Sequence, residues 1–141
     1  GVPVQQWKLL QKGQSVAVEG RTVQPVQVLG APRRGLSVVF SGDTAACPGL
    51  LQAAQDADLL LCDATYALPE QEAQARQWGH STFGQSAALA AQAGAKRLWL
   101  THYSPSLVHA ENYLPQVREI FPDAFLGKDG KNVELMFEDE D

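Results

Sequence analysis

The sequence predicts an α/β fold that begins with a short all-β segment. After residue 35, apolar runs typical of strands alternate with helical patterns, whereas the residues before it are rich in extended-chain and turn signals. The chain has 141 residues, 45% of them apolar and 19% charged, which is the composition of one globular domain and excludes a disordered chain. It contains no internal repeat and no low-complexity segment.

The first third of the chain is predicted to be extended and to contain one β-hairpin. Residues 15–18 and 22–29 carry the strand pattern, and residues 19–21 form the turn, in which Gly20 supplies the backbone freedom. The glycines and the proline of residues 30–35 predict a loop.

Apolar segments predict the strands of the α/β part. We expect strands at residues 36–41, 59–61 and 97–101, and a final strand pair, 125–126 with 133–137, around a turn at 128–131. The first strand holds three consecutive apolar residues and stops at Gly42, which is typical of a buried strand.

Three helices are predicted, at residues 48–55, from Ser81 or Thr82 to Gly94, and at residues 111–121. In the second helix the apolar residues recur on one face, and a glycine is a typical helix end. Pro115 falls in the first turn of the third helix, where proline is tolerated. Residues 69–78, rich in Gln, Glu and Ala, form either a helix or a mobile loop.

Charge and cysteine content limit the function classes. A net charge of −5 excludes a generally basic nucleic-acid coat protein, although a local basic patch can still bind a phosphate. Residues 138–141 are expected to form a frayed acidic tail. Cys47 and Cys62 make no disulfide framework and are interpreted as reduced thiols of a cytosolic protein. No apolar run reaches the length of a membrane span, and no signal peptide is expected from the first residues.

Polar residues that can carry chemistry follow the predicted strands directly, where parallel α/β folds place their sites. Asp43 comes after a strand and a glycine, so its two carboxylate oxygens can bind one cation or bridge two. It equally fits a cap for the helix that follows. Asp63 follows the second strand and can either orient a neighbouring histidine or serve as a turn residue.

Two of the three histidines occupy similar positions. His80 precedes a predicted helix N-terminus, whose free amides attract anions, so it can hold or protonate a phosphate. Alternatively, Ser81 or Thr82 caps the helix and His80 is an exposed loop residue. His102 ends the third strand and can donate an imidazole nitrogen to a metal, or it is a hydrogen-bonded polar residue. His109 lacks such a setting and is expected on the surface.

Three motifs together resemble a known family. Ser-Gly-Asp-Thr at residues 41–44, Gly-His-Ser-Thr at 79–82 and Thr-His-Tyr-Ser-Pro at 101–105 are similar, in this order, to the C-terminal half of ribonuclease Z, the metallo-β-lactamase-fold endoribonuclease that matures tRNA 3′ ends. The resemblance implies an α/β half of an αββα sandwich with an N-terminal β-hairpin. Residues 1–141 are then a single half-domain, with 1–34 near the family's tRNA-binding arm, 35–137 as the β/α unit of the site loops and 138–141 as the tail.

The same resemblance implies roles for seven residues. Asp43 matches a bridging metal ligand and His102 a ligand of the second metal, and two zinc ions, or manganese, are implied as cofactors. His80 matches a residue at the scissile phosphate or the leaving oxygen, and Asp63 stands where the family carries a glutamate, so both are expected to be catalytic. The residues expected to bind substrate or phosphate are Ser81, Thr82 and Ser104.

Departures from the family pattern shape the remaining expectations. No His-x-His-x-Asp-His string is present, so a missing N-terminal half is expected to carry the other ligands and this chain alone to be inactive. Cys-Asp-Ala-Thr at residues 62–65 replaces His-Glu-Ala-Thr, and Ser106 stands in place of an arginine. Precursor tRNA is the expected substrate, and a cytoplasmic homodimer without membrane contact is the expected state. The alternatives are a hydrolase of another small phosphodiester or ester, and an inactive interaction half.

Overall fold

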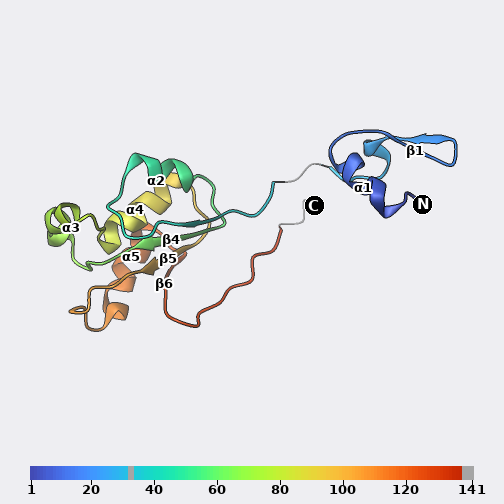
Figure 1. Ribbon diagram of the computed structural model, residues 1–141. Coiled ribbons are helices and arrows are strands. Elements are labelled where there is room, and N and C mark those ends of the chain that lie inside the picture. The colour runs from blue at the N-terminus through green and yellow to red at the C-terminus, as the bar shows by residue number, and fades with distance from the viewer. Residues whose placement is uncertain (32–33, 138–141) are drawn as a thin grey trace. The chain divides into compact units, whose positions relative to one another are not determined.

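The computed structural model describes residues 1–31 and 34–137, and the chain divides into two compact units, Gly1–Arg34 and Gly35–Asp141 (Figure 1). The predicted acidic tail, 138–141, lies outside the described residues. Within those residues, no helix combines the length and the apolar character that crossing a membrane would require.

The first unit contains the predicted hairpin and a helix that was not predicted. Strands β1 (Val16–Val18) and β2 (Arg21–Val23) pair antiparallel, so the hairpin is confirmed. The second strand is shorter than expected because a 3-10 helix, Pro25–Gln27, follows it and proline cannot donate to a strand ladder. The expectation of a fully extended start is wrong, because α1 (Val4–Gln11) consists largely of helix-forming Gln, Lys and Leu residues and buries Leu10.

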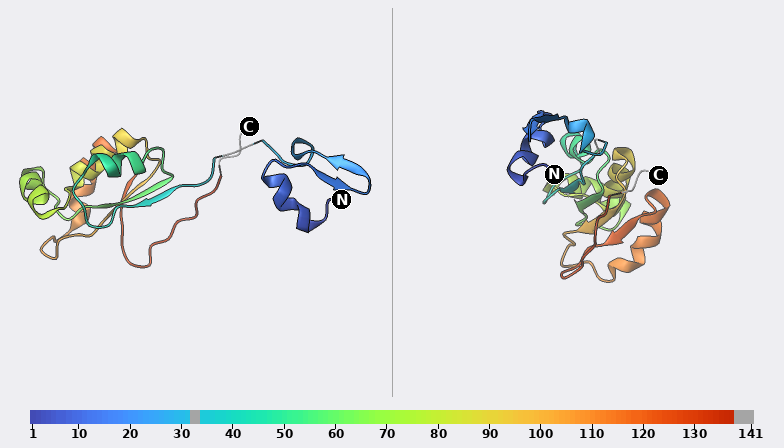
Figure 2. Two further views of the ribbon diagram at one scale, coloured as in Figure 1. Left: turned by 45° about the horizontal axis from the view of Figure 1, so that its top comes forward. Right: turned by 90° about the vertical axis from the view of Figure 1, so that its right-hand side faces the viewer.

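The second unit is a sheet of four parallel strands in sequential order: β3 (Val38–Phe40), β4 (Leu59–Asp63), β5 (Leu98–Thr101) and β6 (Ala124–Leu126). The connections contain α2 (Pro48–Ala53), α3 (Glu72–Trp78) with α4 (Phe83–Ala93), and α5 (Leu114–Ile120). Because such crossovers are right-handed and each strand is added on the same side of the last, the helices collect on one face of the sheet. Figure 2 shows α2 and α4 on that face.

One apolar core lies between the sheet and the helices. From the sheet it receives alternate residues of β4 and β5, which point toward the helices. From the helical side, Phe83 of α4 is 1% exposed and Val117 of α5 is also buried. The small alanines of α4 let this helix lie close to its neighbours. The core residues of the unit include Leu50, Ala54, Leu60, Cys62, Phe83, Ala87, Ala90, Leu98, Leu100, Val117 and Phe121.

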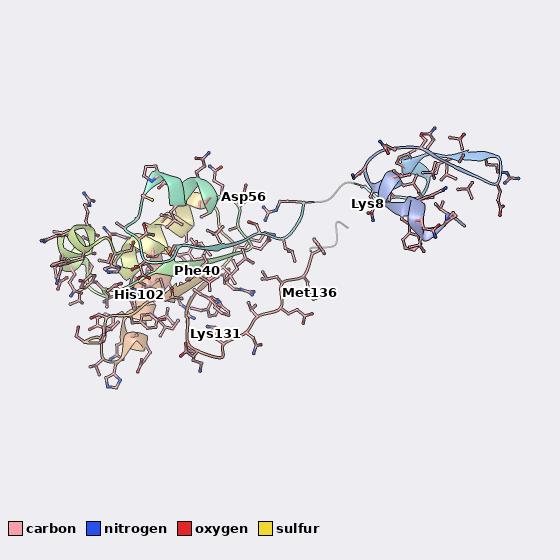
Figure 3. All side chains as sticks on the ribbon, in the orientation of Figure 1. Lys8, Phe40, Asp56, His102, Lys131 and Met136 are labelled. Carbon is pink, nitrogen blue, oxygen red and sulfur yellow. The ribbon has the colours of Figure 1, made fainter. Side chains whose placement is uncertain are left out.

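The opposite face of the sheet carries an apolar row, and among the described residues of the second unit no helix packs over it. Phe40, Leu61, Trp99 and Phe125 are register neighbours across the four strands. Phe40 is 70% exposed, so the first strand is an exposed edge and not the buried strand that its apolar run predicts. We call these four residues the open-face row; Figure 3 labels Phe40.

Two predicted elements near the C-terminus differ from the structure. Residues 133–137 form no strand. Lys131 occupies the edge where a hairpin partner would pair, because its Nζ donates to the Leu126 carbonyl at 2.8 Å and lies 4.7 Å from the Trp99 ring centre. The predicted helix at 111–121 is α5, entered through a 3-10 turn at Ala110–Tyr113, with Pro115 in its first turn as expected. Residues 69–78 are helical, comprising a 3-10 turn and α3.

The position of Phe83 predicts a large loss of stability on truncation. Phe83→Ala removes a fully buried ring beneath the sheet and should lower the free energy of unfolding by about 3–5 kcal/mol. Urea unfolding followed by circular dichroism measures the loss. Trp78→Ala, at a side chain 64% exposed, is the control and should cost far less. Equal losses in the two variants would contradict this account of the core.

Tyr103 ties together the ends of β5 and β6, and its ionisation should weaken the fold. Its hydroxyl lies within hydrogen-bonding distance of the carbonyl oxygens of Leu100 and Gly127. Burial raises the pKa of Tyr103 to about 12. Because the pKa is raised in the folded state, the stabilisation that protonated Tyr103 gives the fold is complete below pH 10, the ordinary tyrosine pKa. It is lost as pH rises toward 12. Tyr103→Phe should therefore be less stable than wild type at pH 8, and this difference should shrink between pH 10 and 12. A difference that does not change with pH would contradict the prediction.

Candidate functional site

The four residues that sequence analysis places at the centre of a site lie together at the C-terminal edge of the parallel strands. Asp43 follows β3, Asp63 ends β4 and His102 follows β5 directly. His80 comes from the loop between α3 and α4. Figure 3 labels His102 at this edge. The gathering follows from the parallel arrangement, because all four strands end on the same side of the sheet.

The carboxylate of Asp63 is the buried centre of the site. Its side chain is 0% exposed, and donors surround both oxygens. Oδ1 accepts from the backbone N–H of Thr65 (3.1 Å), the hydroxyl of Thr65 (2.9 Å) and the backbone N–H of Ser81 (3.1 Å). Oδ2 accepts from the backbone N–H of Thr44 (3.2 Å) and from Nδ1 of His80 (2.8 Å). A buried charge is tolerated when it is hydrogen-bonded in this way, and here the donors come from three separate loops.

His80 is oriented by this carboxylate. Because an ionised carboxylate only accepts, Nδ1 of His80 is the donor, and Nε2 is left for other partners. The His80 side chain is 21% exposed, and its ring stacks on that of His102 with the ring centres 5.1 Å apart. His80 is therefore a partly accessible imidazole with one nitrogen committed to the protein, and not the exposed loop residue of the alternative interpretation.

Ser81 and Thr82 are buried next to His80 and bonded within the chain. Ser81 Oγ donates to the carbonyl of Thr44 at 2.9 Å. Thr82 is the N-cap of α4, and it exchanges hydrogen bonds with Gln85 in a capping box. The cap was one of the two predicted possibilities for this position. Contact of Ser81 and Thr82 with a substrate phosphate stays a prediction, as does that of Ser104, whose N–H donates to the Thr65 carbonyl at 3.0 Å.

Asp43 and His102 face one another at the accessible side of the site. Nε2 of His102 lies 3.2 Å from Oδ2 of Asp43, and the two side chains are 44% and 62% exposed. The helix that follows β3 begins at Pro48 with Cys47 as N-cap, so Asp43 is not its cap. His102 has a φ of 60°, in the left-handed region that is costly for a non-glycine residue and that clusters at functional sites.

The spacing of this pair fits a divalent cation. Two donors bound at 2.0–2.1 Å to a tetrahedral zinc ion lie about 3.3 Å apart, close to the spacing observed. Imidazole and carboxylate are donors that zinc and manganese accept. A second group, Asp63 with His80 and His102, also brings one ligand atom each within 4.8 Å of the others. The Asp43 and His102 pair is the better candidate, because the Asp63 oxygens already accept five hydrogen bonds.

The cysteine near the site is not a ligand candidate. Cys62 is buried in the core on the helical side of β4. Burial raises the pKa of the Cys62 thiol, which keeps the sulfur neutral, whereas metal binding needs the thiolate. Both cysteines are free thiols, as the sequence predicts.

Sequence reasoning missed three hydroxyl side chains that build the surroundings of Asp63. Ser41 Oγ accepts from the Asp63 backbone N–H at 2.9 Å, and Ser86 Oγ donates to the Asp63 carbonyl. Thr65 Oγ1 lies 2.9 Å from Oδ1 of Asp63 and 2.9 Å from Nδ1 of His102. The available signal for Thr65 was its position two residues after an aspartate, where a side-chain turn is common.

Comparisons with known proteins agree with the fold described above. A family model described as the beta-lactamase superfamily domain matches residues 3–103. The ribonuclease Z of Agathobacter rectalis is 47% identical over 139 residues, which are 99% of this chain and 46% of that protein. The chain thus spans about half the length of the curated relatives that it matches.

Two solved structures share the fold. The metallo-beta-lactamase fold protein YhfI of Bacillus subtilis aligns with a TM-score of 0.59 and 25% identity, over 67% of this chain and 37% of that one. The short form of human tRNase Z aligns with a TM-score of 0.57 and 24% identity, over 82% of this chain and 37% of that one, and this similarity bears on the fold alone. The predicted fold class and the resemblance to ribonuclease Z are confirmed. Because the family model matches well over half of the 141 residues of this chain, the chain belongs to the β-lactamase superfamily.

Proposed function

We propose that this chain supplies the C-terminal part of a metal-dependent phosphodiesterase of the ribonuclease Z type, which cleaves precursor tRNA at its 3′ end. The observation that carries the proposal is the buried Asp63 carboxylate. It holds His80 at 2.8 Å beside the Asp43 and His102 pair. The similarity to ribonucleases Z over 99% of the chain supports the same reaction.

In this proposal Asp43 and His102 hold a divalent cation, zinc or manganese. When bound, the cation contributes positive charge that stabilises the negative charge developing on the phosphoryl oxygens. The pair offers two donors, so the remaining ligands of a two-metal site come from the part of the protein that the relatives have and this chain does not span. The chain by itself is then expected to be inactive.

His80 contacts the substrate phosphate and handles a proton there. Its Nδ1 is held by Asp63, so Nε2 is the atom that can donate to a phosphoryl oxygen or to the leaving oxygen. Asp63 fixes the orientation of the His80 ring, because its Oδ2 accepts a hydrogen bond from Nδ1 at 2.8 Å. Ser81 and Thr82 hold the loop of His80 in place through their buried hydrogen bonds.

The open-face row indicates where the rest of the enzyme packs. Phe40 is exposed at the edge of this row, Trp99 is buried within it, and among the described residues of the second unit no helix covers the face. In an αββα sandwich the second sheet covers this face, and burial of the row would stabilise the pairing. We propose the N-terminal half of the enzyme as this partner.

A smaller phosphodiester is the second candidate substrate. The site loops, residues 41–44, 63–66, 79–82 and 101–106, contain no Lys or Arg, and Ser106 stands where the family carries an arginine. Binding of a polyanion such as tRNA then requires cations from outside these loops, whereas a small phosphodiester does not.

His80→Ala in the complete enzyme should lower the single-turnover rate constant for precursor tRNA cleavage by about 10²- to 10⁴-fold, because the proton donor at the phosphate is lost. His109→Ala is the matched control, since His109 is exposed and its Nδ1 lies 3.1 Å from Oε1 of Glu111. Gel assays of 3′-end cleavage under single-turnover conditions measure the rates. Equal rates for the two variants would reject the role of His80, and cleavage of a small phosphodiester but not of tRNA would select the second substrate.

Asp43→Ala and His102→Ala should each lower the metal content of the purified complete enzyme, because each removes one of the two donors that this chain offers to the ion. Elemental analysis after dialysis measures zinc and manganese per molecule. The matched control is Asp129→Ala, in the turn after β6. Metal content unchanged in both site variants would place the metal elsewhere.

A further inference from the structure

Thr65 joins the buried carboxylate to the histidine on the accessible side. Its side-chain oxygen lies 2.9 Å from Asp63 Oδ1 and 2.9 Å from His102 Nδ1. The residue itself is fixed at both backbone groups, because its N–H donates to Asp63 Oδ1 at 3.1 Å and its carbonyl accepts from the N–H of Ser104 at 3.0 Å. Thr65 is 7% exposed, so water does not compete freely for the hydroxyl.

The chemistry of the three groups assigns a direction to this chain of contacts. An ionised carboxylate can only accept, so the single proton of the Thr65 hydroxyl goes to Asp63. The oxygen of Thr65 is then an acceptor toward His102, and Nδ1 of His102 must carry the proton that it receives. Nε2 of His102 is left with its lone pair facing the Asp43 carboxylate 3.2 Å away.

We propose that Thr65 is a positioning residue that sets the tautomer of His102. Its hydroxyl donates to Asp63 and therefore accepts from Nδ1 of His102, and we call this arrangement the relay. One buried carboxylate would thus hold both histidines as Nδ1–H tautomers, His80 directly and His102 through the hydroxyl. The link to metal binding rests on the proposed function, in which the free Nε2 of His102 and the Asp43 carboxylate hold the cation.

The opposite arrangement is less stable for a local reason. If Thr65 donated to His102, the proton of His102 would lie on Nε2 and would point at Asp43. Asp43 is 62% exposed and can be hydrogen-bonded by water, so it gains little. Asp63 is 0% exposed and would lose one of its five donors with no water to replace it. The buried carboxylate therefore decides the direction.

Among the described residues, the titratable groups that face the ring of His102 are those already named. Asp43 faces its Nε2, Asp63 Oδ2 lies 3.6 Å from its Nδ1, and the ring of His80 stacks on it, among the described residues. A different source for the tautomer would have to act through one of these three. Among the described residues, Thr65 is the neutral group in direct hydrogen-bond contact with Nδ1.

The test is the tautomer of His102 in metal-free protein, read from long-range ¹H–¹⁵N correlation spectra of the histidine rings at pH 8. Wild type should show the proton on Nδ1 of His102. Thr65→Val removes the hydroxyl at nearly constant shape and should move the proton of His102 toward Nε2, while Thr65→Ser should restore Nδ1. His80 is the internal control, because its direct bond to Asp63 should keep its proton on Nδ1 in all three proteins. A wild-type proton on Nε2 of His102, or no change in Thr65→Val, would overturn the proposal.

A second measurement separates the relay from the proposed function. Titration of the metal-free complete enzyme with Zn²⁺ alone, followed by calorimetry, should show an affinity about 10- to 100-fold weaker for Thr65→Val and restored for Thr65→Ser. If wild type binds no Zn²⁺ but holds the His102 proton on Nδ1, the relay stands and the proposed metal function fails. The wild-type spectrum alone decides the tautomer if Thr65→Val does not fold.

Discussion

The site depends on one buried charge, the carboxylate of Asp63. Removing a carboxylate from water is costly unless donors replace the solvent, and here five hydrogen bonds do so. These donors come from the loop after β3, from the residues after β4 and from the segment before α4. Each loop is therefore held in place by the need to satisfy the same two oxygens. The precision of the site follows from the energetic cost of leaving that charge unpaired.

Strand order determines what surrounds this charge. Four parallel strands in sequential order place all strand ends at one edge, and α2, α4 and α5 pack on one face. The first consequence brings Asp43, Asp63 and His102 together from positions far apart in the sequence. The second leaves the open-face row without a helical layer among the described residues of the second unit, with Lys131 over the rings of Trp99 and Phe125. The site and the uncovered face thus have a common origin in the topology.

The sequence predicted the parts of the structure that depend on local pattern and strand polarity. Helix α4 was predicted because Thr82 and Gly94 are typical ends, and the strands β4 and β5 because their apolar runs are continuous. The gathering of Asp43, Asp63 and His102 followed from the rule on strand ends, whereas His80 reaches the site from the loop before α4. Helix α1 was missed because its 8 residues are too few to establish a helical period. The exposure of β3 was missed because an apolar run does not tell an edge strand from a central one. Thr65 was missed because its importance lies in two contacts, one of them 37 residues away in sequence.

The candidate metal ligands are exposed, whereas the groups that orient the histidines are buried. Asp43 and the Nε2 atom of His102 lie where a cation and a phosphate can reach them, and Asp63 and Thr65 lie beneath them out of solvent. Thr65 and Asp63 each accept a hydrogen bond from Nδ1 of one histidine ring, so each ring keeps its Nε2 for other partners. Transition-state charge on a phosphodiester would then meet imidazoles whose orientation was settled when the chain folded, so little reorganisation is needed during the reaction.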